Sequence, residues 1–116
     1  MKDKKDVKNF NFIGVDSSLK GNLNFKGPTY FHGNLEGNIY QEDFATLNCE
    51  MSSSIQGDIY GANIEIYGEV IGNIHAINHL TIYPTAKISG NIKSKNFKVY
   101  AGANFNGEMN STQSNL

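Results

Sequence analysis

Residues 19–23 read LKGNL, and this five-residue pattern returns five more times along the chain. It reads LEGNI at 35–39, IQGDI at 55–59, VIGNI at 70–74, ISGNI at 88–92 and FNGEM at 105–109. The central glycines are 16, 20, 15, 18 and 17 residues apart, so one repeat holds about 17 residues. Six copies at this period indicate an array in which each repeat forms one structural unit.

Other positions of the repeat are restricted too. The residues two before and two after each central glycine are apolar in all six copies. The residue four before it is small in every copy: Ser17, Gly33, Ser53, Gly68, Ala86 and Ala103. The column eight before it also fits an inward strand position: Ile13, Thr29, Cys49, Ile64, Ile82 and Val99. Because these offsets are even, an extended chain projects them to one face.

A repeat of this length holds three short strands, separated by corners where only a small residue fits inside. Stacking such coils every ~4.8 Å buries a continuous core that no single coil could bury. We therefore predict an all-β fold, a right-handed parallel β-helix of about six coils, because the irregular coil length and the series Ile82, Ile88, Ser94 do not fit a left-handed hexapeptide helix. The predicted domain is 11–109, with flexible tails at 1–10 and 110–116 and an insertion at 41–44.

Composition excludes several classes of protein. The chain has 116 residues, enough for one compact domain. Its net charge is -1, so no basic field is available to hold a nucleic acid. It has one cysteine, no apolar run of the roughly 18 residues of a spanning helix, and no signal-peptide core at its start. These features predict a reducing, cytoplasmic setting.

Three stretches of the chain resemble those of bactofilins: IG at 13–14 with GNL at 21–23, TYFHGNLEGNI at 29–39, and AGANFNG at 101–107. The resemblance implies a bacterial cytoskeletal protein that assembles without nucleotide into nonpolar filaments and supports cell shape and cell-wall organisation. It implies partners among copies of the chain, the inner face of the cell membrane, cell-wall enzymes and other cytoskeletal proteins. It implies no cofactor.

Candidate chemical sites are few. His75 and His79 have a helical metal-ligand spacing, but they fall between strand patterns, where a solvated turn is expected. Cys49 occupies an inward column and is expected to be a packing thiol. Glu65 and Glu69 could act as paired acids on a sugar, but six coils leave no large loops to build a cleft. We expect no enzymatic activity; the alternative function is a β-solenoid binding module or scaffold that recognises protein or glycan along a rod face.

The two ends of the predicted rod are the candidate polymer interface. A bare end coil exposes strand edges and apolar core, and both tails are too polar to cover it. The interface residues predicted in the first and last repeats are Phe12, Ile13, Val15, Phe25, Phe97, Val99, Phe105 and Met109. The candidate membrane contact lies in the N-terminal tail and consists of Met1, Lys2, Lys4, Lys5 and Lys8.

Overall fold

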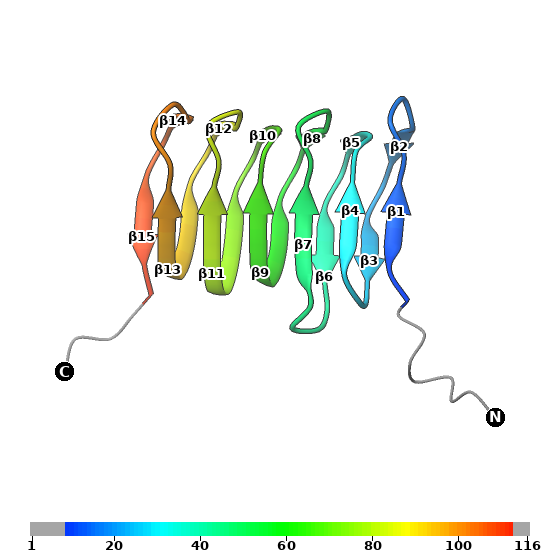
Figure 1. Cartoon of the computed structure of the whole chain (residues 1–116), viewed down its shortest axis with the longest axis horizontal. Coiled ribbons are helices and arrows are strands. Elements are labelled where there is room, and N and C mark those ends of the chain that lie inside the picture. Colours follow the sequence, from blue (N-terminus) through cyan, green and yellow to red (C-terminus); the bar gives the residue numbers. More distant parts are fainter. Residues whose placement is uncertain (1–8, 113–116) are drawn as a thin grey trace.

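The computed structural model describes residues 9–112, which form fifteen β-strands wound into a six-coil solenoid (Figure 1). The first three coils contain β1 (Asn11–Ile13), β2 (Ser18–Lys20), β3 (Leu23–Phe25), β4 (Thr29–Phe31), β5 (Asn34–Glu36), β6 (Ile39–Gln41), β7 (Thr46–Cys49), β8 (Ser54–Gln56) and the first half of β9 (Ile59–Ile66). The last three contain the rest of β9, β10 (Glu69–Ile71), β11 (Ile74–Ile82), β12 (Lys87–Ser89), β13 (Ile92–Val99), β14 (Asn104–Asn106) and β15 (Met109–Ser111).

The coils stack as two parallel sheets. One side of the rod is the six-stranded sheet β14-β12-β10-β8-β5-β2. The nine-stranded sheet forms the other two sides, because β9, β11 and β13 each turn a corner and pair on both. In Figure 1 the front strands run upward and the strands behind run downward as the rod advances from right to left, which is a right-handed path. The predicted all-β, right-handed solenoid is confirmed.

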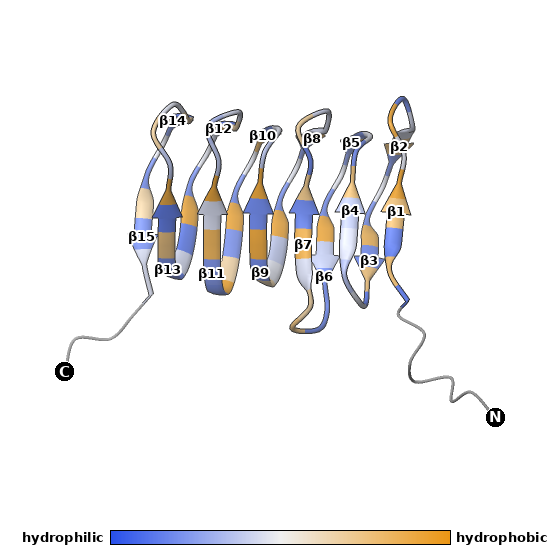
Figure 2. Ribbon diagram, viewed as in Figure 1, coloured by the Kyte–Doolittle hydropathy of each residue, from blue (hydrophilic) through white to orange (hydrophobic). Residues whose placement is uncertain are grey.

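The core consists of the predicted apolar columns. The column two before each central glycine stacks Leu35, Ile55, Val70 and Ile88, all at most 2% exposed. The column two after it stacks Ile39, Ile59, Ile74 and Ile92, which are buried as well. Figure 2 shows the corresponding alternation of apolar and polar residues along the strands.

Glycine is required at the corner that follows the six-stranded sheet. Gly72 has a φ of 150°, in the region that L side chains rarely adopt, and a Cβ there would overlap the carbonyl oxygen of Gly57 in the preceding coil. The neighbouring polar position forms a second ladder: the side-chain oxygen of Asn38 accepts the N–H of Asp58 at 2.8 Å, and Asp58 accepts that of Asn73 at 2.9 Å. This corner is therefore fixed by backbone contact between coils and by side-chain hydrogen bonds.

The residues eight before each glycine lie at inward positions as predicted, but in two coils they stack in a different column. The actual inward column contains Ile13, Phe31, Cys49, Ile66, Ile82 and Val99. Thr29 and Ile64 lie two residues earlier, in the column of Leu47 and Leu80. A shift of two keeps the parity of the strand, so both residues are still buried.

The cause of this shift is the length of the first corner. Four residues separate β1 from β2, but only two, His32 and Gly33, separate β4 from β5. Tyr67 and Gly68 make the same short corner before β10. A Cβ on Gly68 would overlap the Glu50 carbonyl oxygen of the preceding coil. The short corner therefore needs glycine, whereas the longer corners carry Ser or Ala at this position.

The insertion also differs slightly from its prediction. Gln41 is the last residue of β6 and is buried, so the loop consists of residues 42–45. The Gln41 side-chain Nε2 donates to the Gly27 carbonyl oxygen at 2.7 Å and to Asp43 Oδ1 at 3.0 Å. Asp43 also accepts the N–H of Gly27 at 2.7 Å and the N–H of Ala45 at 3.2 Å. The Asp43 carboxylate thus fastens the loop to the turn of the preceding coil.

These hydrogen bonds, above all the one from Gln41, hold the pKa of Asp43 below its ordinary value. The ionised Asp43 carboxylate therefore stabilises the loop at pH values above its unfolded-state pKa. This contribution is lost as the pH falls through the lowered pKa of the folded state. We expect the Gly27 and Ala45 amide protons to exchange faster in Asp43→Asn than in the parent at neutral pH, measured by hydrogen exchange with NMR. Glu42→Gln is the matched control; equal protection in Asp43→Asn and the parent would contradict this role.

Candidate polymerisation interface

The last coil leaves apolar core uncovered. Ile82 is fully buried, whereas Val99, its partner in the next coil, is 44% exposed. Ile92 is fully buried, whereas its partner Met109 is 40% exposed. Within residues 9–112 no strand stacks beyond β14, β15 or the second half of β13, so the exposed fraction rises because no further coil covers them.

Two aromatic residues complete this C-terminal end. Phe105 lies opposite Ile88 and is half-buried against the core. Phe97 lies opposite Leu80 and is also half-buried. The C-terminal end thus presents Phe97, Val99, Phe105 and Met109 together with the open edges of three strands. An apolar patch framed by unpaired strand edges is a template for pairing with another chain.

The first coil places its predicted residues less uniformly. Ile13 and Phe25 point inward and are half-buried, and Leu19 and Leu23, which the predicted interface omitted, share this environment. Phe12 instead points outward from β1, with its ring centroid 5.0 Å from that of His32. The N-terminal end is therefore formed by Ile13, Leu19, Leu23 and Phe25.

Val15 is exposed and lies in the turn between β1 and β2. Met1, Lys2, Lys4, Lys5 and Lys8 lie outside the described residues. Within 9–112 no helix is long and apolar enough to cross a membrane.

The candidate chemical residues are spread over the sides of the rod. His75 and His79 both lie within β11 and are exposed; the predicted turn is wrong because β11 continues around the corner. Cys49 is buried as predicted, and desolvation, followed by the nearby Glu50 charge, raises the pKa of its thiol. Among the described residues no three His, Cys, Asp or Glu side chains gather in a metal-binding group.

Glu65 and Glu69 contact different neighbours. Glu65 Oε1 accepts hydrogen bonds from the hydroxyls of Tyr83 at 3.2 Å and Tyr67 at 3.5 Å. Glu69 Oε1 accepts one from the hydroxyl of Ser54 at 3.5 Å. The Tyr67 and Tyr83 rings stack with centroids 4.0 Å apart. Glu65 therefore orients a surface tyrosine stack.

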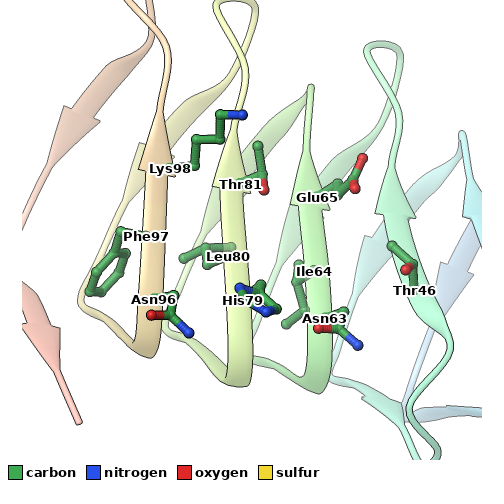
Figure 3. A pocket seen from close by; sticks show the side chains of 10 residues that line it. All are labelled: Thr46, Asn63, Ile64, Glu65, His79, Leu80, Thr81, Asn96, Phe97 and Lys98. Carbon is green, nitrogen blue, oxygen red and sulfur yellow. The ribbon is translucent and has the colours of Figure 1, made fainter. Parts of the chain in front are cut away.

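A shallow groove of about 580 Å³ runs along one side of the rod, over β9, β11 and β13. Figure 3 shows its two polar rows, with Asn63, His79 and Asn96 in one and Glu65, Thr81 and Lys98 in the other. Its floor is the backbone at Ile64, Leu80 and Phe97, whose side chains belong to the core side of the strands, and Thr46 lies at the far margin. Such a surface suits an extended polar ligand, and Phe97 brings it to the C-terminal end.

Comparisons with known proteins identify the family of this chain. The family model Bactofilin, described as polymer-forming cytoskeletal, matches residues 11–110. Bactofilin BacO of Myxococcus xanthus (strain DK1622) is 28% identical over 97 residues, which cover 84% of this chain and 75% of that protein. No solved structure matches significantly. Because the family model spans all six coils of the solenoid, the chain belongs to the bactofilin family.

Proposed function

We propose that this bactofilin is a structural cytoskeletal protein that assembles end to end, without nucleotide, into filaments that support cell shape and cell-wall organisation. The observation that carries the proposal is the C-terminal end, where Val99, Phe105 and Met109 leave core columns uncovered. Covering one such side chain contributes about 2 kcal/mol. The family's polymer-forming description supports the same conclusion.

Nucleotide-free assembly is supported by the role of the glycines. Gly37, Gly57, Gly72 and Gly90 each donate their N–H to a carbonyl of the following coil. They are therefore committed to coil stacking and do not form a loop that cradles phosphate at the start of a helix. We therefore expect assembly to proceed without nucleotide.

Sedimentation at rising protein concentration, with neither nucleotide nor metal added, tests this function. We expect the full chain to move from the supernatant to the pellet above a threshold concentration. A chain that stays monomeric at every concentration would contradict it.

The alternative is a binding module or scaffold for protein or glycan, and the groove in Figure 3 favours it. Its amide, hydroxyl and charged side chains could hydrogen-bond an extended polymer along the rod. Such a module would remain monomeric in sedimentation while His79→Ala and Thr81→Ala weaken binding of the glycan or peptide tested. A polymer would instead pellet above a threshold concentration, and His79→Ala and Thr81→Ala would leave binding of that glycan or peptide unchanged.

We place the filament in the cytoplasm, peripherally at the inner face of the cell membrane, with cell-wall enzymes or other cytoskeletal proteins as partners. The four lysines of residues 1–8 favour an anionic lipid surface, at about 1 kcal/mol each, although Asp3 and Asp6 reduce this attraction. Phe10 and Phe12, about 60% exposed, extend the segment with apolar side chains. Polymerisation multiplies a weak single contact.

Flotation with anionic liposomes tests this contact. We expect the full chain to float with the vesicles and a chain lacking residues 1–9 to remain at the bottom, because the deletion removes the lysines. Neutral vesicles are the control. Equal recovery of the two chains with anionic vesicles would count against the membrane contact.

A further inference from the structure

The loop at residues 42–45 interrupts the regular coil but is held firmly. Asp43 and Gln41 fasten it to Gly27, as described above, and the Asn63 side-chain Nδ2 donates to the Phe44 carbonyl oxygen at 2.8 Å. Figure 1 shows the loop between β6 and β7 extending beyond the neighbouring turns at the same edge of the rod. A loop braced from both sides presents its outermost side chain in a fixed position.

That side chain is Phe44, which is 73% exposed, the highest value among the large apolar residues described. Glu42 and Asp43 precede it, and Lys26 lies 4.0 Å from the Glu42 carboxylate, so the tip as a whole is weakly acidic. An aromatic side chain on a preorganised support is typical of an interface anchor, because little conformational entropy is lost when it binds. We call residues 42–45 the loop tip.

A depression with complementary chemistry lies on β9, β11 and β13. It has a volume of about 300 Å³ and is lined by Tyr60, Asn73, Ile74, His75, Asn91 and Lys93. The volume exceeds the roughly 150 Å³ of a cavity that holds benzene. Tyr60 stacks on Tyr40 at 5.2 Å and meets the ring of His75 at 6.4 Å, so aromatic surface borders the space.

The charged side chain that lines the depression is the lysine Lys93, which can pair with a carboxylate of a second molecule. Lys95 follows on the same strand, and both lysines are exposed. The nearest carboxylate residues are Asp58, whose Oδ1 accepts the N–H of Asn73 at 2.9 Å, and Glu108, whose N–H donates to Asn91 Oδ1 at 3.2 Å; both belong to the hydrogen-bond ladder of the corner and do not line the depression. The depression is therefore large enough for an aromatic ring, and Lys93 offers a charge opposite to that of Glu42.

We propose that the loop tip of one protomer docks into this depression on a second copy in a neighbouring filament, as a lateral contact. The proposal rests on end-to-end assembly for its setting. Each rod presents one tip and one depression, so two rods related by a two-fold axis make the contact twice. A filament repeats the contact along its length, which converts a weak pair into a stable bundle.

The test separates bundles from filaments by low-speed and high-speed sedimentation, with negative-stain microscopy of each pellet. We expect Phe44→Ser to reduce the low-speed pellet at least tenfold and to leave the high-speed pellet of single filaments unchanged. Ile71→Ser, which removes another exposed apolar side chain on a different side of the rod, is the matched control and should bundle like the parent.

A charge exchange makes the test specific to this pair of surfaces. Lys93→Glu should reduce bundling, and Glu42→Lys combined with Lys93→Glu should restore it. Bundling of Phe44→Ser at the parent level, no recovery in the double variant, or a parent that forms only single filaments would overturn the proposal. If the parent forms no filaments, end-to-end assembly is contradicted separately. The lateral contact then predicts that the parent forms a dimer and that Phe44→Ser does not. A parent without such a dimer overturns the lateral contact.

Discussion

Replacing Gly72 with Ala is expected to lower the free energy of unfolding by about 2–6 kcal/mol. About 1–3 kcal/mol comes from the positive φ, which a side chain makes unfavourable. A further 1–3 kcal/mol or so comes from overpacking, because the new Cβ overlaps the Gly57 carbonyl oxygen. The measurement is the urea midpoint in a Phe105→Arg background, where loss of assembly does not contribute to the difference.

Gly21→Ala is the matched control for this variant. Gly21 also has a positive φ, of 113°, but a Cβ there meets nothing within 4 Å because no coil precedes it among the described residues. Gly21→Ala should therefore lower the free energy of unfolding only by the backbone strain, about 1–3 kcal/mol. Equal destabilisation by the two variants would mean that close stacking of the corners does not hold the coils together.

Phe105→Arg is expected to abolish filaments while leaving a folded, β-rich monomer or dimer. Phe105 is half-buried at the rim of the core, so the monomer loses little. In a joint, the substitution removes about 2 kcal/mol per side and leaves an unpaired charge against apolar surface. A joint with two-fold symmetry contains Phe105 twice, so the substitution lowers the association constant of the joint nearly a thousandfold.

Sedimentation at concentrations where the parent pellets, with far-ultraviolet circular dichroism to confirm folding, measures this effect. Ile71→Arg is the matched control, because Ile71 is an exposed apolar residue on the side of the rod. It should pellet like the parent. Long filaments of Phe105→Arg would show that the C-terminal coil is not a joint and that assembly uses the rod faces.

The sequence predicts the coils well because each repeat carries its own constraint. Apolar residues two positions on either side of the glycine are core in every inner coil, since strand parity is set by the local pattern. Counting eight residues back from a glycine, however, crosses a corner and gives the wrong stacking column in two coils. Corners of two and of four residues keep the parity of the strand but shift its stacking register by two residues. Gly33 and Gly68 were the available signal: glycine replaces Ser or Ala only in the two short corners.

The ends were harder to predict than the core. Phe105 and Met109 follow the inward columns, so their position at the C-terminal end could be read from the repeat. Hydrophobicity assigns Phe12 to the end, although its odd offset from Gly21, next to the inward Ile13, already indicates the outward position that β1 gives it. The role of Asp43 depends on hydrogen bonds between coils, which no pattern within one repeat reveals.

Cryo-electron microscopy of filaments grown from the purified full chain, without nucleotide, tests end-to-end assembly most directly. Six coils at ~4.8 Å predict an axial rise of about 29 Å per protomer, or a repeat of about 58 Å if protomers alternate in direction. The 4.8 Å spacing should lie along the filament axis. Filaments with that spacing across their axis, or with a rise unrelated to about 29 Å, would contradict end-to-end assembly.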